Sequence, residues 1–99
     1  MTKSIIQPFG HSCFLCGKNG AQDRLERHHV YGGANRGKSE EDGLWVWLCG
    51  NECHRNGKDA AHRNRDTMDH LHRAGELAYL EAYNKTKEDF LTRYGRNYL

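Results

Sequence analysis

Four cysteines in this chain of 99 residues fall into two closely spaced pairs, Cys13-x-x-Cys16 and Cys49-x-x-x-Cys53. A tight turn lets both thiolates of a pair face one ion, and two such pairs complete a tetrahedron. The second pair contains one extra residue, which its turn must absorb as a bulge. We therefore predict a single structural zinc site. A redox-active cysteine pair and two disulfides are the alternatives to it.

Histidine is also abundant, with seven in the chain, and four of the seven lie on or near the expected cysteine-bounded unit. His28 and His29 are neighbours in a segment of strand-forming composition, so their side chains must point to opposite faces. One of them can bind a metal while the other faces a different target. His54 directly follows the last cysteine, where a zinc site would hold it in place, and His62 lies near the expected start of a helix.

The elements that carry these side chains are short. Residues 1–12 are expected to be a weakly structured lead-in, because a proline and a glycine interrupt any regular element. Residues 25–31 and 44–48 are rich in strand-forming side chains, and a polar, glycine-rich loop over residues 32–38 joins them. This combination predicts an antiparallel hairpin enclosed by the two cysteine pairs.

Two helices are expected after the cysteines. From about Lys58 to Tyr83 there is no proline, and apolar residues recur at helical spacing. A second helix should begin after Thr86, because Asp89 completes a capping-box-like start, and Gly95 is a suitable stop. Its apolar side chains should pack it onto the body: Phe90, Leu91 and Tyr94. A turn, a hairpin and helices in this order predict an α+β fold.

The composition is polar for a folded domain, with 36% hydrophobic residues and a mean hydropathy of -0.97. A domain this small buries little apolar surface, so bound metal is expected to supplement its core. The net charge of +2 is compatible with nucleic acid but does not by itself argue for it. The longest apolar stretch, residues 44–49, is too short for a signal peptide or a membrane span. We therefore expect a cytoplasmic protein with no membrane partner.

The ordered combination of these pieces resembles the HNH (ββα-metal) endonucleases, in a form that carries a zinc-knuckle pair. The similarity runs from Cys13 onward and includes a group of small HNH proteins encoded by phages and prophages. It is carried by His28-His29-Val30, the glycine-rich loop, Ser39-Glu40, Gly43-Leu44, Leu48-Cys49, Cys53-His54, Ala61-His62 and the ending from Phe90 to Tyr98-Leu99. The resemblance implies one HNH domain over residues 1–99, with its core at 13–62 and C-terminal helices at 63–99.

The resemblance also implies a role for each histidine. His28 and His54 would bind the catalytic metal, and His29 would be the general base that activates water. His62 would be a further ligand or a phosphate contact. Imidazole ligands accept Mg, Mn, Ni, Co or Zn as the catalytic ion, which is separate from the structural zinc. The central Asn of the family motif is replaced here by Leu44, which puts the orientation of His29 in question.

The implied activity is metal-dependent hydrolysis of DNA phosphodiester bonds, leaving 5′-phosphate and 3′-hydroxyl ends. Basic side chains around the motif can hold phosphates: Arg27, Arg36, Lys38, Arg55 and Arg63. In a phage, the family suggests packaging or recombination proteins as partners, in the cytoplasm of the bacterial host. The alternative is a catalytically silent zinc module that binds nucleic acid or protein. Such a module needs only the cysteines, and would leave the histidines unexplained. The sequence indicates no oligomeric state.

Overall fold

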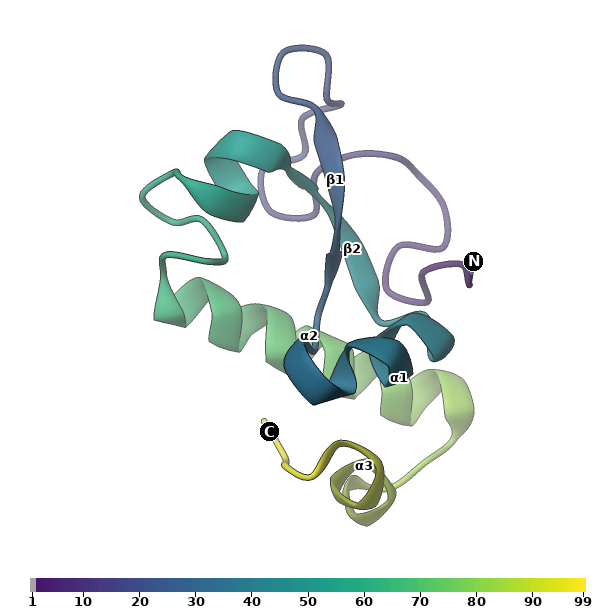
Figure 1. Cartoon of the computed structure of the whole chain (residues 1–99). Coiled ribbons are helices and arrows are strands. Elements are labelled where there is room, and N and C mark those ends of the chain that lie inside the picture. Colours follow the sequence, from purple (N-terminus) through teal and green to yellow (C-terminus); the bar gives the residue numbers. More distant parts are fainter. Residues whose placement is uncertain (1) are drawn as a thin grey trace.

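The computed structural model describes residues 2–99, which form a two-stranded antiparallel hairpin and three α-helices. The hairpin stands over the long helix α2, with α1 in front and α3 below (Figure 1). The predicted α+β class with a hairpin is confirmed. The elements in order are β1 (Leu25–His29), a 3-10 turn (Gly33–Asn35), α1 (Arg36–Glu41), β2 (Trp45–Cys49), a π-helix (Gly50–Arg55), α2 (Arg65–Tyr83) and α3 (Lys87–Tyr94).

The register of the hairpin decides which way each strand histidine points. His28 pairs with Val46, and His29 pairs with Trp45. Residues directly opposite each other share a face of the sheet, and neighbours along a strand alternate between faces. Val46 is fully buried, so His28 belongs to the buried face and is itself only 4% exposed. His29 lies on the other face, with Trp45 and Trp47.

The connection between the strands is more ordered than the sequence predicted. The expected loop over residues 32–38 instead contains the 3-10 turn and the start of α1, so that prediction is wrong for most of its length. Ser39 explains why a helix is stable here. It is fully buried, its Oγ donates to the Leu44 carbonyl at 2.5 Å, and it accepts the Tyr31 N–H at 3.3 Å. The helix α1 is thereby tied to the chain that leaves β1 and to the chain that enters β2.

The helix α2 begins at Arg65, later than the predicted start near Lys58. Asn64 ends the preceding turn, and its side chain accepts the N–H of Thr67 at 3.0 Å as an N-cap. Residues 58–64 therefore form turns and coil rather than helix, and His62 precedes the helix. Gly75 lets α2 pack closely against Tyr31, which follows β1. A Cβ at this position would lie 2.8 Å from the Tyr31 hydroxyl, which is too close without a shift.

The helix α3 agrees with its prediction at both ends. Thr86 and Asp89 form the reciprocal capping box, and Gly95 ends the helix with a positive φ of 82°. Phe90 and Tyr94 are buried as expected. Leu91 is 45% exposed, so its predicted packing is wrong.

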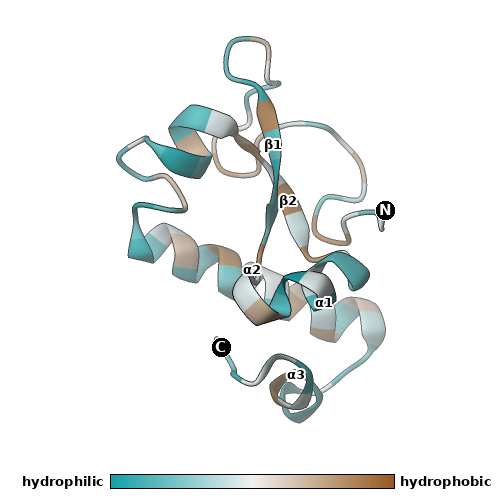
Figure 2. Ribbon diagram, viewed as in Figure 1, coloured by the Kyte–Doolittle hydropathy of each residue, from teal (hydrophilic) through white to brown (hydrophobic). Residues whose placement is uncertain are grey.

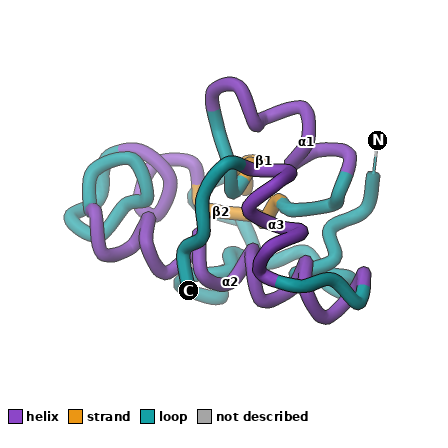
Figure 3. Tube along the Cα trace, turned by 90° about the horizontal axis from the view of Figure 1, so that it is seen from below, coloured by secondary structure: helices purple, strands orange, loops and turns teal. Residues whose placement is uncertain are grey.

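The buried residues form two clusters. One surrounds three of the four cysteines, and the other is largely aromatic, with members Val30, Tyr31, Leu44, Tyr79, Phe90 and Tyr94. Hydrophobic residues are concentrated on β2 and in bands along α2, whereas most of β1 is hydrophilic (Figure 2). Seen from below, the strands lie at the centre with helices around them (Figure 3). No helix in residues 2–99 combines the length and apolar character needed to cross a bilayer.

The lead-in contains no helix or strand over residues 2–12, as predicted, but it is fastened to β2. The Ser4 hydroxyl donates to the Trp45 carbonyl at 2.5 Å, and the Trp47 N–H donates to Oε1 of Gln7 at 2.8 Å. The segment therefore covers the edge of β2 that β1 leaves free.

Candidate metal centres

The four cysteines converge although their pairs are far apart in the sequence. Their sulfur atoms all lie within 4.8 Å of one another, and none is paired in a disulfide. The first pair, Cys13 and Cys16, sits in a turn closed by a hydrogen bond from the Gly17 N–H to the Cys13 carbonyl at 2.8 Å. Cys49 ends β2, and Cys53 lies in the π-helix. These four side chains can bind a metal ion.

The π-helix accommodates the extra residue of the second pair. Its backbone closes wider than an α-helix, with the Asn56 N–H donating to the Asn51 carbonyl at 2.8 Å. The carboxylate of Asp23 holds the start of this element, since it accepts the N–H groups of Asn51 and Glu52 at 2.9 and 2.8 Å. These two bonds also lower the pKa of Asp23.

The electrostatics of the cysteine cluster favour a cation. Burial would raise the pKa of Cys13, but hydrogen bonds from the backbone around Cys16, Cys49 and Leu15 lower it to about 7. Burial and the neighbouring thiols raise the pKa of Cys49 to about 12, and they also raise that of Cys53. The Cys13 thiolate forms readily, but the thiolates of Cys49 and Cys53 need a positive ion beside them. This is the behaviour of a thiolate metal site.

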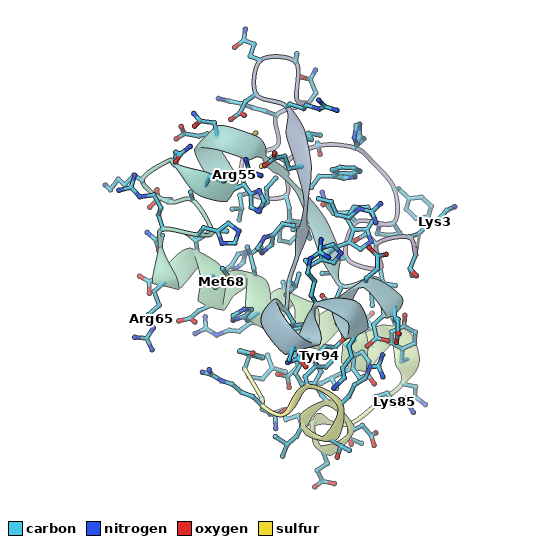
Figure 4. All side chains as sticks on the ribbon, viewed as in Figure 1. Lys3, Arg55, Arg65, Met68, Lys85 and Tyr94 are labelled. Atoms are coloured by element: carbon cyan, nitrogen blue, oxygen red, sulfur yellow. The ribbon has the colours of Figure 1, made fainter. Side chains whose placement is uncertain are left out.

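A second cluster consists of His28, His54 and His62. One ring nitrogen of each lies within 4.8 Å of those of the other two. The Nε2 atoms of His54 and His62 are 3.1 Å apart. Figure 4 shows several nitrogen-containing rings gathered between the labelled Arg55 and Met68. The histidine cluster can therefore offer three imidazole nitrogens to a single divalent ion.

Three different elements supply this histidine cluster. His28 comes from β1, His54 from the π-helix, and His62 from the turn before α2. Two backbone hydrogen bonds join the last two segments. The Ala61 N–H donates to the Cys53 carbonyl at 2.8 Å, and the His62 N–H donates to the His54 carbonyl at 3.1 Å. The segment that carries the last cysteine therefore also positions two of the three histidines.

His28 shows most clearly that a metal fits the histidine cluster. Its Nε2 is buried and has no hydrogen-bond partner within residues 2–99. Burial and the neighbouring His54 and His62 lower its pKa to about 3, so the ring is neutral near pH 7. A buried polar nitrogen without a partner costs about 1–3 kcal/mol. A bound cation would turn this unsatisfied atom into a ligand.

His29 is separate from the histidine cluster, as strand alternation predicted. Its side chain is 9% exposed, and its Nε2 lies 3.0 Å from Oε1 of Glu40 on α1. The same oxygen accepts a hydrogen bond from the Arg27 guanidinium at 3.0 Å, and that guanidinium lies 3.8 Å from the centre of the Trp45 ring. The hydrogen bond with His29 is the main reason why the pKa of Glu40 is lowered.

Glu40, and not Leu44, contacts His29. Leu44, at the Asn position, is fully buried, and its backbone bonds to Val30 and Ser39. It therefore belongs to the core and cannot brace His29. Sequence reasoning noted Ser39-Glu40 only as part of the resemblance and gave Glu40 no role, because no helix was predicted between the two strands.

The five predicted phosphate contacts fall into two groups. Arg55 and Arg63 lie next in sequence to His54 and His62, and both are exposed. Arg55 pairs with Glu26 at 3.1 Å, and the Arg63 guanidinium donates to the Asn56 carbonyl at 2.9 Å. The others lie on β1 beside His29 or on α1: Arg27, Arg36 and Lys38.

Two further side chains were missed. His72 is half-buried and stacks on Tyr31 with ring centroids 5.5 Å apart, and burial lowers its pKa. Glu26 was not singled out at all, although its carboxylate contacts His54.

Neither a family model nor a curated protein or solved structure matches this chain. The two clusters are therefore the features from which a function can be proposed.

Proposed function

We propose that this chain is a metal-dependent endonuclease of the HNH (ββα-metal) type that hydrolyses DNA phosphodiester bonds. The observation that carries the proposal is the buried, unpartnered Nε2 of His28 within a cluster of three histidines. A silent zinc module would need only the cysteines. It would have no reason to keep a second, energetically costly set of metal ligands on different elements.

In this proposal the cysteine cluster holds a structural zinc ion. Its closed set of four thiolates leaves no position for a substrate, as is usual for structural sites. Cys53 and His54 are adjacent, so the zinc would fix the π-helix and with it one ligand of the second centre. The histidine cluster supplies only three ligands, which is typical of a catalytic site that keeps positions open.

A divalent ion held by His28, His54 and His62 would neutralise charge on the phosphate and assist the departing oxygen. His29 is the proposed general base. The Glu40 carboxylate can only accept a hydrogen bond, so Nε2 of His29 carries the proton and Nδ1 keeps its lone pair. Nδ1 is the atom proposed to take a proton from water, since Nε2 is engaged by Glu40. Arg55 and Arg63 would hold phosphates beside the histidine cluster.

A plasmid-nicking assay tests the proposal. Supercoiled plasmid is incubated with the zinc-loaded chain in Mg²⁺, Mn²⁺ or Ni²⁺, and the wild type is compared with His29→Ala. Loss of a general base should lower the rate by roughly 10²- to 10⁴-fold. His70→Ala, an exposed histidine on α2, is the matched control and should nick like the wild type.

Equal nicking by His29→Ala and the wild type would show that the activity does not come from this site. No nicking by a wild-type chain that holds both ions would favour the silent module. The packaging or recombination partners follow from the family resemblance alone and stay a prediction.

A further inference from the structure

Glu26 lies on β1, two residues before His28, and therefore on the same face of the strand. Its side chain is 32% exposed, at the edge of the histidine cluster. Oε1 lies 2.9 Å from Nδ1 of His54, and Oε2 lies 3.1 Å from the Arg55 guanidinium. One carboxylate thus contacts two successive residues of the π-helix, one of which is a proposed metal ligand.

The contact with Glu26 decides which nitrogen of His54 carries the proton. An ionised carboxylate has no proton to give, so the short contact requires a hydrogen on Nδ1. In the neutral ring Nε2 is then unprotonated, and this is the atom that lies 3.1 Å from Nε2 of His62. Without Glu26, the ring could take the other tautomer or turn away, and either change would remove a lone pair from the histidine cluster.

The backbone beside Glu26 leaves space for this carboxylate. Gly50 follows Cys49 directly, and a Cβ at Gly50 would lie 2.8 Å from Cδ and 2.9 Å from Oε1 of Glu26. Any side chain at this position would push the carboxylate away from His54. The contact therefore depends on the absence of a side chain at Gly50.

We infer that Glu26 is a positioning residue of the histidine centre, which holds His54 with Nε2 unprotonated and directed at the bound ion. The inference rests on the proposed function, because it takes the histidine cluster to bind a divalent metal. A carboxylate that accepts the second N–H of a ligating imidazole fixes its orientation and makes it a better donor. Loss of such a partner weakens metal binding by roughly 10- to 100-fold.

Calorimetric titration with Ni²⁺ measures this directly in the full chain loaded with one equivalent of Zn²⁺. Glu26→Ala should bind Ni²⁺ roughly 10- to 100-fold more weakly than the wild type. Glu26→Gln should lose less, because its amide oxygen still accepts the Nδ1 hydrogen but has no charge. Glu81→Ala removes the same charge from an exposed position on α2 and should bind like the wild type.

A second readout separates positioning from general damage to the fold. Nitrogen-15 NMR of the histidine side chains, before Ni²⁺ is added, should show the Nδ1–H tautomer for His54 in the wild type. In Glu26→Ala this signal should change to a mixture of tautomers. Gly50→Ala keeps the carboxylate but displaces it, so it should weaken Ni²⁺ binding while the chain still retains its Zn²⁺.

The outcomes are distinct. Equal Ni²⁺ affinity in Glu26→Ala and Glu81→Ala overturns the role of Glu26. A wild type that binds no ion beyond its zinc overturns both this role and the metal part of the proposed function. Ni²⁺ binding that depends on Glu26, without any nicking of DNA, supports this role and overturns the nuclease. If Glu26→Ala does not fold, the near-isosteric Glu26→Gln and the tautomer spectrum decide the question.

Discussion

The cysteine cluster and the histidine cluster share one segment of chain but are built in opposite ways. The cysteines come as two local pairs whose turns set their geometry, and the set of four donors is complete. The three histidines come from three different elements. One of them, His28, has a buried ring nitrogen without a hydrogen-bond partner within residues 2–99. We expect the cysteine centre to stabilise the fold when it holds its ion, and the histidine centre to cost stability while it is empty.

Removal of one thiolate should have the largest effect. Cys49→Ser should abolish tight zinc binding and leave the domain unfolded at 25 °C, because structural zinc contributes on the order of 10–16 kcal/mol in small domains. Cys49 is fully buried at the end of β2, so the change also affects the hairpin. Circular dichroism and zinc analysis of the purified protein provide the measurement. A folded, zinc-free variant would refute the structural role of the cysteine cluster.

Removal of one imidazole from the histidine cluster should not destabilise the domain, in contrast to removal of a thiolate. His28→Leu replaces the ring with an apolar side chain of similar size and removes the unpartnered Nε2. With zinc in place and no second ion added, we expect its unfolding free energy in urea to equal that of the wild type or exceed it by up to about 2 kcal/mol. Ni²⁺ binding should be lost.

The control for His28→Leu is Val46→Ala, at the residue that pairs with His28 in the hairpin. It removes only apolar packing and should destabilise the domain while Ni²⁺ binding persists. Strong destabilisation by His28→Leu would mean that His28 is a structural residue and that the orphaned nitrogen has another partner.

The two carboxylates that contact histidines should separate metal binding from base catalysis. Glu40→Ala should lower the nicking rate by roughly 10- to 100-fold, since misplacing a reacting group by about 1 Å costs on that order. It should leave Ni²⁺ affinity unchanged, in contrast to Glu26→Ala. Glu41→Ala, next to it on α1 and bonded to Arg93, is the matched control for nicking. A drop in Ni²⁺ affinity in Glu40→Ala would contradict the assignment of metal binding and base catalysis to opposite faces of the hairpin.

The sequence predicted those parts of the molecule that local rules determine. The spacing of the cysteines, the alternation that separates His28 from His29, and the capping box at Thr86 all depend on residues close together in the chain. The helix α1 was missed because the glycines of residues 32–38 suggested a loop, and what stabilises it is the long-range burial of Ser39. The contact of Glu40 with His29 was not predicted either, because Glu40 lies on that helix.

The remaining site features depend on contacts between distant segments. Glu26 reaches His54 only because the hairpin brings β1 beside the π-helix, and nothing in the local sequence around either residue predicts this contact. The start of α2 was predicted too early because residues 58–64 have no helix-breaking proline. They are held instead by bonds to the Cys53 and His54 carbonyls, which place His62 in the histidine cluster.

The smallest expected effect concerns the basic side chains. Arg63 lies beside the histidine cluster, whereas Arg36 lies on α1, on the His29 side of the hairpin. If DNA docks over the histidine cluster, Arg63→Ala should weaken binding only a few-fold, with the slope of log affinity against log salt reduced by about one. Arg36→Ala should change neither quantity. Fluorescence anisotropy of a labelled duplex at several salt concentrations measures both. Equal losses in the two variants would contradict docking over the histidine cluster alone.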